Sequence, residues 1–582
     1  MSDNNQVELD QLRHSAAHLL AAAVMELYPS AKRTIGPAIE HGFYYDFDFG
    51  NIKITDSDLL KIEKKMRQLI PTWKSFERHE LSVGEVKTEF KDNEYKLELI
   101  NEFNREGQTI TVYQSGNFRD LCRGGHVGEP SKTLKFFKLT KLAGAYWRRD
   151  AKNKMLTRIY GTAFFTQEEL DHYLWLQEEA KKRDHRKLGR ELDLFSFSDY
   201  VGSGMPLYSP KGALVRRLLN GYVEELQSKQ GYLQVHTPQI AKAELFKRSG
   251  HYDKYKEDMF RVVSNYSDEE FFLKPMNCPQ HTQIYASQAR SYRDLPLRIT
   301  DFAMLYRDEK PGELNGLARV RSFSQDDCHI FCREDQVDTE VDMALAMTKE
   351  IMETFGFKYR YRLSTRDPEH PEKYLGDPKV WDKLEKWAVT IMERNKIPYY
   401  DGPGEAAFYG PKMDLMATDA LGREWQLSTV QIDMVQPERF ELEYTAEDGT
   451  KKRPVMIHRA ILGSSERAMM VLLEHYSGAF PLWLSPIQLM LLPISENELS
   501  YTQELAKSLT YAGLRTEVDE SNHTLGKKIV RARELKVPYM AILGKKEVEN
   551  KTLTLKSRDG EQITLNLDEA IAKLTQEVLS KV

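Results

Sequence analysis

The stretch LYRDEKPGELNGLARVRSFSQDDCHIF, from Leu305 to Phe331, carries the most informative pattern in this chain. Its turn-rich centre, residues 310–316, separates two segments in a way that predicts two short strands joined by a loop. Such a hairpin would place Arg307, Arg319 and Arg321 on one surface. Because the planar guanidinium group binds pairs of oxygen atoms, this surface suits a polyphosphate and a carboxylate. Taken alone, the stretch also fits a solvated charged hairpin.

The composition indicates a soluble, core-forming protein with about three or four domains, since the chain has 582 residues, 41% hydrophobic and 29% charged. No apolar run approaches the length needed to cross a bilayer. The apolar stretch 16–27 follows acidic residues and contains His18, which is unlike a secretory signal. Four cysteines in so long a chain do not make a disulfide framework, so we expect a reducing cytoplasm.

The charge is uneven along the chain. The net charge is −5, yet residues 526–558 hold ten basic and three acidic side chains, a local balance of +7. A basic surface of this kind suits a phosphate backbone, although a solvated helix and hairpin would have the same composition. The chain has no GxxxxGK[ST] loop and no GxGxxG after a strand, so a nucleotide enzyme would need another phosphate cradle.

Two breaks, at residues 181–190 and 481–486, divide the chain into three regions. The first mixes an N-terminal helix with strand-like pieces. The middle alternates strands such as 423–431 and 454–461 with helices, and the hairpin signal at 447–449 favours an antiparallel sheet. The last region alternates strands and helices, which favours a small α/β domain with a mixed sheet. We therefore expect a multidomain α/β protein with domains at 1–185, 186–484 and 485–582.

Two short motifs could form a hydrolytic or metal site. His14 and His18, in HSAAH, would share one face of a helix, and Cys122 and His126, in CRGGH, lie in a glycine-bearing loop. Three imidazoles and one thiol could bind zinc. They could equally position a water molecule without a metal. An HxxxH motif with no other support also fits two surface histidines.

Three further residues, Cys278, His329 and His458, are individually unremarkable, because a buried free cysteine is usually just a small apolar residue. The sequence around His329, CHIFC, has no standard metal-ligand spacing. The stretch Gly463 to Arg467 predicts a glycine turn after a strand, followed by an amphipathic helix. An arginine in the first turn opposes the helix dipole, which favours a ligand-facing role for Arg467.

Together and in this order, these blocks resemble the class II aminoacyl-tRNA synthetases. Residues 213–240 look like motif 1 of that class, 305–331 like motif 2 and 463–467 like motif 3. Within the class, the chain is similar to the threonyl-tRNA synthetase family over essentially its whole length. The segments that carry this likeness are HSAAH, CRGGH, KPMNCP, RVRSFSQDDCHIF, FYGPKMD, EWQLSTVQID and VMIHRA.

The resemblance implies an α+β editing domain, a class II catalytic core with an antiparallel sheet flanked by helices, and a C-terminal α/β anticodon-binding domain. It implies ATP-dependent attachment of L-threonine to tRNA(Thr) through a threonyl-adenylate, with Mg²⁺ accompanying ATP. One Zn²⁺ per subunit would be held by Cys278, His329 and His458, with an open position for the amino and hydroxyl groups of threonine. Such a site would exclude valine, which an apolar pocket separates only weakly from threonine.

Further roles follow from the same resemblance. Asp327 would accept a hydrogen bond from the threonine hydroxyl, and Tyr409 would contact the amino group. His251 would lie near the terminal ribose of the tRNA and help in proton transfer. Residues expected to bind ATP or the adenylate are Arg307, Glu309, Arg319, Phe323, Gln325, Gln426, Thr429 and Arg467.

Serine carries the same two coordinating groups as threonine, and its missing methyl is worth only ~1–3 kcal/mol. A second, hydrolytic site for Ser-tRNA(Thr) is therefore expected, and the family's site is generally read as metal-free. Its residues would be His14, His18, Lys96, Asp120, Cys122 and His126. Anticodon contacts would come from Asn522, Glu547 and Lys556, the last replacing an arginine. The resemblance also implies a homodimer through motif 1.

The chain departs from the family's usual order at its start. HSAAH begins at residue 14, so we expect the small N-terminal ubiquitin-like domain of the family to be absent. Two other functions stay open. Another class II synthetase, such as a prolyl or seryl enzyme, would share the ATP motifs but gives no reason for Cys278, His329 and His458. A non-catalytic RNA-binding paralogue would be expected to lose the ATP-site arginines.

Overall fold

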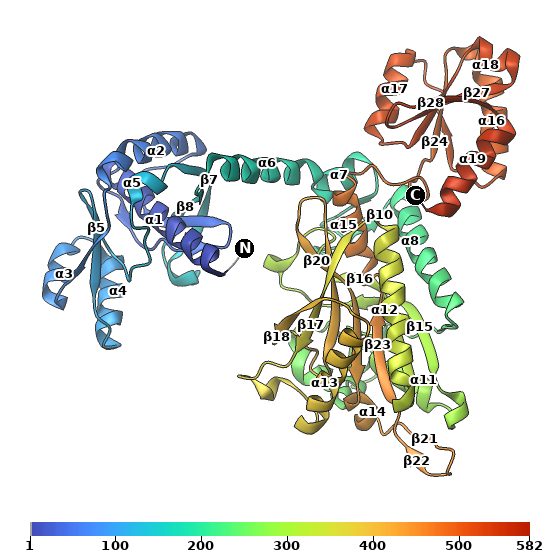
Figure 1. Ribbon diagram of the computed structural model, residues 1–582, viewed down its shortest axis with the longest axis horizontal. Helices are drawn as coiled ribbons and strands as arrows, with labels where there is room; N and C mark the ends of the chain where they lie inside the picture. Colours follow the sequence, from blue (N-terminus) through green and yellow to red (C-terminus); the bar gives the residue numbers. More distant parts are fainter. Residues whose placement is uncertain (1–2, 582) are drawn as a thin grey trace. The chain divides into compact units, whose positions relative to one another are not determined.

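The computed structural model describes residues 3–581, apart from the side chains of residues 3, 4 and 149, and divides between residues 178 and 179 into two compact units (Figure 1). The four cysteines are free and buried. Within the described range, none of the helices has the length and apolar character needed to span a bilayer.

The first unit is built on a five-stranded antiparallel sheet and a smaller three-stranded sheet. Helix α1 (Asp3–Leu27) packs against β3 and β8, and its residues 19–24 are fully or almost fully buried. This explains why its central part is apolar on every face. The elements are β1 (Lys32–Arg33), β2 (Ala38–Ile39), β3 (Gly42–Asp48), α2 (Asp56–Leu69), β4 (Glu77–Glu80), α3 (Val83–Glu89), α4 (Glu94–Arg105), β5 (Thr111–Ser115), β6 (Phe118–Leu121), α5 (Pro130–Thr133), β7 (Phe136–Tyr146) and β8 (Met155–Phe164). The boundary between the two units falls within α6 (Gln167–Arg183).

The second unit contains an eight-stranded, mostly antiparallel sheet in the order β11-β15-β16-β23-β20-β19-β17-β18. The predicted hairpin is confirmed: β15 and β16 pair antiparallel from Leu297↔Phe331 to Tyr306↔Ser322. The strands are β11 (Leu233–Gln234), β15 (Leu297–Tyr306), β16 (Ser322–Cys332), β17 (Lys358–Thr365), β18 (Tyr399–Pro403), β19 (Lys412–Thr418), β20 (Glu424–Asp433) and β23 (Val455–Ala460).

Helices and short strands surround this sheet, and its main core joins residues of α8, α12, α13 and α15 to the strands. The hairpin signal at residues 447–449 is confirmed by the pairing of β21 with β22. These elements are α7 (His185–Glu191), β9 (Phe195–Ser196), β10 (Leu207–Tyr208), α8 (Pro210–Lys229), β12 (Ile240–Lys242), α9 (Ala243–Ser249), α10 (His251–Tyr255), β13 (Arg261–Val262), β14 (Phe271–Leu273), α11 (Cys278–Ala286), α12 (Val337–Thr354), α13 (Pro378–Arg394), α14 (Val435–Arg439), β21 (Tyr444–Thr445), β22 (Lys451–Lys452) and α15 (Ser465–His475).

The C-terminal part has the mixed sheet that its sequence predicts, in the order β25-β24-β26-β27-β28. β24 pairs parallel with β25 and β26, while β27 pairs antiparallel with both neighbours. The elements are β24 (Leu489–Pro493), α16 (Leu499–Tyr511), β25 (Thr516–Val518), α17 (Leu525–Glu534), β26 (Tyr539–Leu543), α18 (Lys545–Asn550), β27 (Thr552–Ser557), β28 (Gln562–Asn566) and α19 (Leu567–Ser580).

Two features differ from the sequence pattern. The polar stretch 181–190 is mostly helical, because α6 ends at Arg183, Asp184 caps α7 and α7 begins at His185. The basic cluster is partly engaged inside the protein: buried Lys528 donates to the carbonyls of Pro493 and Asp519. Arg558 likewise donates to main-chain carbonyl groups. The local excess of +7 therefore overstates the charge available to a partner.

Candidate functional site

Strand alternation brings the candidate residues of the central sheet to one face. In β16, residues 323, 325, 327 and 329 have the same parity, so their side chains point the same way. His458 of β23 lies directly opposite His329, and Gln431 of β20 lies opposite His458. The sheet thus aligns residues that are up to 129 positions apart in the sequence, as His329 and His458 are.

Cys278, His329 and His458 form a compact, buried group, with one potential ligand atom of each lying within 4.8 Å of the others. His329 Nε2 is 2.9 Å from His458 Nδ1. Cys278 is the first residue of α11, while the two histidines come from neighbouring strands. This is the one-thiol, two-imidazole donor set that the sequence left unsupported by spacing.

Neighbouring hydrogen bonds orient both imidazoles toward this point. The Asp433 carboxylate accepts from His458 Nε2 at 2.7 Å, which leaves His458 Nδ1 with a free lone pair. His329 Nδ1 lies 2.7 Å from His281 Nδ1, so donation from His329 would leave its Nε2 as a lone pair as well. Metal-binding histidines usually make a supporting hydrogen bond of this kind with the ring nitrogen that does not face the metal.

Burial sets the protonation states of this group. It lowers the pKa of His329 well below its ordinary value and raises the pKa of the Cys278 thiol well above its ordinary value. The His329 imidazole is thus neutral, as a metal-binding imidazole must be, whereas the Cys278 thiol would ionise only beside a strong positive charge. The donor set therefore fits a divalent, thiol-accepting ion with three protein ligands.

Three other candidate residues surround this group. Asp327 accepts a hydrogen bond from the backbone N–H of Asn277 at 3.2 Å. The Tyr409 ring stacks on the His458 ring with centroids 4.5 Å apart, and its hydroxyl donates to Gln431 at 2.7 Å. His251 is fully buried, with its Nε2 3.6 Å from Cys278 Sγ and its ring against Phe408, and burial lowers its pKa to about 3.

A cavity of about 300 Å³ lies beside the cluster on the same sheet face. A β-bulge contributes to its shape, because the register shift between Leu415 and Met416 leaves Leu427 without a partner and brings Gln426 into phase with Thr429. All eight residues predicted to bind ATP line this cavity: Arg307, Glu309, Arg319, Phe323, Gln325, Gln426, Thr429 and Arg467.

Cations dominate one wall of this cavity. Burial lowers the pKa of Arg467, and the nearby Arg307 and Arg319 lower it further. Arg307 lies over the Phe323 ring, 5.1 Å from its centroid, while Arg319 pairs with Glu309 and Glu313, each at 2.7 Å. A concentration of arginines with limited acidic compensation suits an anionic polyphosphate.

The turn before α15 is held by a residue that the sequence reasoning passed over. Buried Asp326, on the opposite face of β16, accepts from the backbone N–H groups of Ile461, Leu462 and Gly463 at 2.7–3.1 Å. Burial raises the pKa of Asp326 to about 7. Ser464 then caps α15 by accepting from the Arg467 N–H at 3.0 Å, which sets where the Arg467 side chain enters the cavity.

A second cluster lies in the first unit, where the fold brings the HSAAH and CRGGH motifs together. The rings of His14 and His18 have centroids 5.1 Å apart, and Cys122 Sγ lies 3.5 Å from His14 Nε2 and 3.2 Å from His126 Nε2. Burial lowers the pKa of His18 to about 3 and raises that of Cys122 to about 11. Neutral imidazoles beside an un-ionised thiol can accept protons from, or orient, a bound water molecule.

A buried charge network supports this cluster. Asp120 pairs with Lys96 at 2.8 Å and Arg33 at 3.1 Å, and it accepts from the Tyr45 hydroxyl. Burial alone would raise the pKa of Asp120, but the two cations outweigh it and hold the pKa below its usual range. The cavity here, about 440 Å³, is lined by five of the six residues predicted for hydrolysis: His14, His18, Lys96, Asp120 and Cys122. His126 completes the cluster by contacting Cys122.

The three predicted anticodon residues are spread over the C-terminal part. Asn522 lines a groove of about 530 Å³ together with Pro493, Ser495 and Lys528. The Glu547 carboxylate accepts from the Gly544 N–H at 3.0 Å and the Thr554 hydroxyl at 3.3 Å. Lys556 lies on β27, opposite Met540 and Gln562. Of the three predicted anticodon residues, Asn522 alone lines this groove.

The supporting residues differ in how far the sequence indicates them. Asp433 falls at the end of the alternating run EWQLSTVQID, in phase with Gln431, so its position on the site face was accessible from periodicity. Arg33 and His281 gave no such signal, since each reaches its partner only through the folded arrangement.

Comparison with known proteins agrees with the geometry. Residues 260–476 match the family described as tRNA synthetase class II core domain (G, H, P, S and T). Residues 488–577 match the anticodon binding domain, and residues 110–160 match the threonyl and alanyl tRNA synthetase second additional domain.

Similar proteins point the same way. The chain is 48% identical to the threonine–tRNA ligase of Rubrobacter xylanophilus, over 94% of this chain and 85% of that one. It is 46% identical to the threonine–tRNA ligase of Halalkalibacterium halodurans, over 98% and 89% of the two chains. A crystal structure titled as the RNA binding domain of threonyl-tRNA synthetase from Cryptosporidium parvum aligns with TM-score 0.65 and 40% identity, covering 68% of this chain and 98% of that one.

Proposed function

The chain belongs to the threonine–tRNA ligases, with a class II core, an anticodon-binding domain and an editing-domain family match, and from that premise we propose how its two clusters divide the work. The sheet cluster of Cys278, His329 and His458 would select threonine over valine with zinc. The first-unit cluster would hydrolyse Ser-tRNA(Thr).

The convergence of the three ligands supports the zinc proposal most directly. Cys278 Sγ, His329 Nε2 and His458 Nδ1 would hold the ion, with Asp433 and His281 supporting the two rings. Bound zinc would supply an open position that favours a nitrogen or oxygen donor over a methyl group. Asp327 would accept the threonine hydroxyl hydrogen, and Tyr409 would contact the amino group. Valine lacks the hydroxyl and would leave Asp327 unpaired, a penalty that an apolar pocket does not impose.

ATP would occupy the adjoining arginine-lined cavity. Arg307 would contact the α-phosphate and the threonine carboxylate, Arg319 the γ-phosphate and Glu309 the adenine amino group. Phe323 and Arg467 would enclose the adenine ring by stacking and cation–π attraction. No protein nucleophile is needed. A threonine carboxylate oxygen would attack the α-phosphorus in line, the bond between the α-phosphorus and the bridging oxygen would break, and pyrophosphate would leave. Alignment of the carboxylate with the α-phosphate promotes this step, and the arginines, with the Mg²⁺ that accompanies ATP, would neutralise the developing charge.

The first-unit cluster would remove misattached serine. Neutral His14, His18 and His126 would position a water molecule against the ester bond, while Asp120 and Lys96 would fix the cavity wall. The small methyl difference between serine and threonine makes this second selection step necessary.

Further proposals rest on the family alone. We propose contacts of Asn522, Glu547 and Lys556 with anticodon bases, a ribose-side role for His251, a homodimer, a cytoplasmic location, and domains at 1–185, 186–484 and 485–582. Because His251 is fully buried beside Cys278, its ribose role would require a movement that exposes the imidazole.

Pyrophosphate exchange tests the selection proposal. Zinc-loaded protein should exchange label into ATP with threonine, more weakly with serine, and not detectably with valine or proline. Exchange driven by proline or serine only, in protein that contains no zinc, would favour another class II synthetase. RNA binding without any amino-acid-dependent exchange would favour the non-catalytic alternative.

A further inference from the structure

The segment that leads into the second unit is fastened to the loop that borders the ATP cavity. Arg183, at the end of α6, donates to the carbonyls of Glu474 and His475 at 3.3 Å and 2.8 Å, where α15 ends. Two residues later, His185 starts α7 and is only 4% exposed. Its imidazole lies between the end of α15 and the loop of the β15–β16 hairpin.

The hydrogen bonds of His185 specify one tautomer. The backbone N–H of Leu317 donates to His185 Nε2 at 3.0 Å, so Nε2 must carry a lone pair. His185 Nδ1 then carries the hydrogen and donates to Glu474 at 2.7 Å, and the His185 backbone N–H donates to the same carboxylate oxygen at 3.1 Å. A neutral imidazole therefore connects an acidic side chain on one side to a loop N–H on the other.

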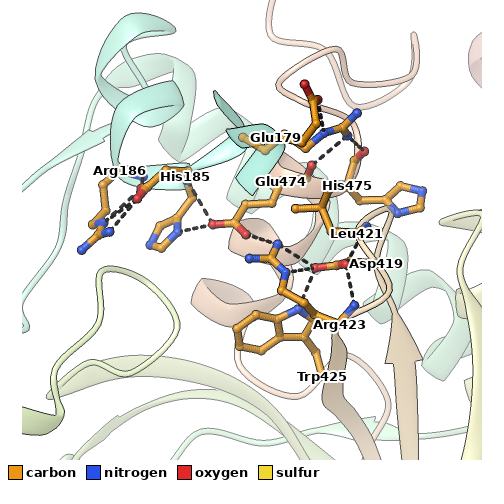
Figure 2. A network of polar contacts seen from close by, with 11 residues as sticks. Glu179, His185, Arg186, Asp419, Leu421, Arg423, Trp425, Glu474 and His475 are labelled. Carbon is orange, nitrogen blue, oxygen red and sulfur yellow. Dashed lines mark hydrogen bonds and ion pairs between the residues drawn. The ribbon is translucent and has the colours of Figure 1, made fainter. Parts of the chain in front are cut away.

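The second carboxylate oxygen of Glu474 pairs with the Arg423 guanidinium. Figure 2 shows Arg423 between Glu474 and Asp419, with the Arg423 guanidinium 2.7 Å from Asp419. Asp419 also accepts from the Trp425 indole at 3.0 Å. Asp184, His185 and Glu474 lie close enough to suggest a cation site, but their polar atoms are occupied by these hydrogen bonds and by Arg186. We therefore treat the group as a hydrogen-bonded clamp.

The loop side of the contact is equally constrained. Gly316 has φ +50°, and a Cβ atom at this position would lie 2.0 Å from His185 Nε2. The next residue but one, Ala318, lines the ATP cavity, and its carbonyl accepts from Arg467 Nε at 3.2 Å. Arg319, also a lining residue, follows directly. The Leu317 contact is therefore one residue from Ala318 and two residues from Arg319, and Ala318 in turn accepts from Arg467.

We propose that His185 is a positioning residue for ATP, which holds the 315–319 turn in its nucleotide-binding geometry by accepting the Leu317 N–H. The inference rests on the ATP assignment proposed above. It adds a residue outside the cavity to that assignment, and it makes the contact between α7 and the 315–319 turn, both within the second unit, a requirement for tight ATP binding.

Two amide substitutions test the two hydrogen bonds of the His185 ring one at a time: the bond to Glu474 and the bond from the Leu317 N–H. In His185→Asn the amide N–H₂ replaces Nδ1–H and can donate to Glu474, but the side chain is too short to reach Leu317. In His185→Gln the amide oxygen reaches the Nε2 position and can accept the Leu317 N–H. Losing one hydrogen bond to the loop should raise the KM for ATP about 3- to 10-fold in His185→Asn. His185→Gln should stay close to wild type, and the KM for threonine should be unchanged in both.

The measurement is threonine-dependent pyrophosphate exchange by the full chain at varied ATP, with His370→Asn, a change at an exposed histidine, as the matched control. Gly316→Ala disturbs the same contact from the loop side and should raise the KM for ATP in the same way, which keeps the test valid if a His185 variant folds poorly. Equal KM values for ATP in His185→Asn and His185→Gln, with wild-type activity normal, would overturn this inference alone. A wild-type protein with no threonine-dependent exchange would overturn the proposed function and this inference with it.

Discussion

Replacing Asp433 with asparagine should weaken zinc binding while leaving the fold intact. One carboxylate oxygen of Asp433 accepts from the backbone N–H groups of Val435 and Gln436 at 2.7 Å and 2.9 Å, and the other accepts from His458 Nε2 at 2.7 Å. In Asp433→Asn the two backbone donors require the amide oxygen on their side. The amide N–H₂ must then face His458.

This arrangement reverses the His458 tautomer. An N–H₂ group facing Nε2 favours a lone pair there and a hydrogen on Nδ1, which points at the proposed metal position. Loss of such a supporting carboxylate typically costs about 10- to 100-fold in metal affinity. That range corresponds to about 1.4–2.7 kcal/mol of binding free energy.

The assay is competition for zinc between the protein and a chelating dye, with metal content measured after dialysis. Asp401→Asn, a change at an exposed position, serves as the control. The circular dichroism spectrum of Asp433→Asn and its unfolding transition should match those of the wild type. Wild-type zinc affinity in this folded variant would refute the reasoning that Asp433 sets the tautomer of His458.

Other predictions concern the first unit. Cys122→Ala should leave threonine activation unchanged and let Ser-tRNA(Thr) accumulate in an aminoacylation assay with serine; unchanged clearance of Ser-tRNA(Thr) would refute the assigned editing site. Asp120→Asn should destabilise the first unit by ~3–5 kcal/mol in urea unfolding, because it leaves the buried Lys96 and the half-buried Arg33 as uncompensated cations. Folding lowers the pKa of Asp120, so its ionised form stabilises the fold. This contribution is complete above the pKa of the unfolded chain, about 4, and is lost as the pH falls toward the pKa of the folded state. The stability difference between wild type and Asp120→Asn should therefore shrink below about pH 4, and a difference that stays constant would contradict the charge-network account.

Local periodicity predicted the parts of the site that lie along single elements. The i, i+4 spacing placed His14 and His18 on one face of α1. The alternation in SFSQDDCHIF is likewise the pattern that puts Gln325, Asp327 and His329 on one face of β16 in the structure. The long strands and helices of the central and C-terminal sheets also matched, because their apolar patterns are regular.

Contacts between distant elements could not be predicted in this way. The pairing of His329 with His458 depends on the register of β16 against β23, and the bond between Arg33 and Asp120 joins two elements with no common pattern. Composition was misleading at Lys528, whose charge is turned inward to carbonyl groups. The role of His185 was hidden for a related reason, since its stretch looked like a polar break and not a buried contact.

Zinc X-ray absorption spectroscopy tests the central claim most directly, because it reports the ligands of the metal itself. The account predicts one sulfur ligand at about 2.3 Å and two histidine nitrogens at about 2.0–2.1 Å, from Cys278, His329 and His458. Addition of threonine should introduce new nitrogen and oxygen ligands at the open position, and addition of valine should not introduce the oxygen. A shell without sulfur, or one unchanged by threonine, would contradict the claim that this cluster holds the metal that selects the amino acid.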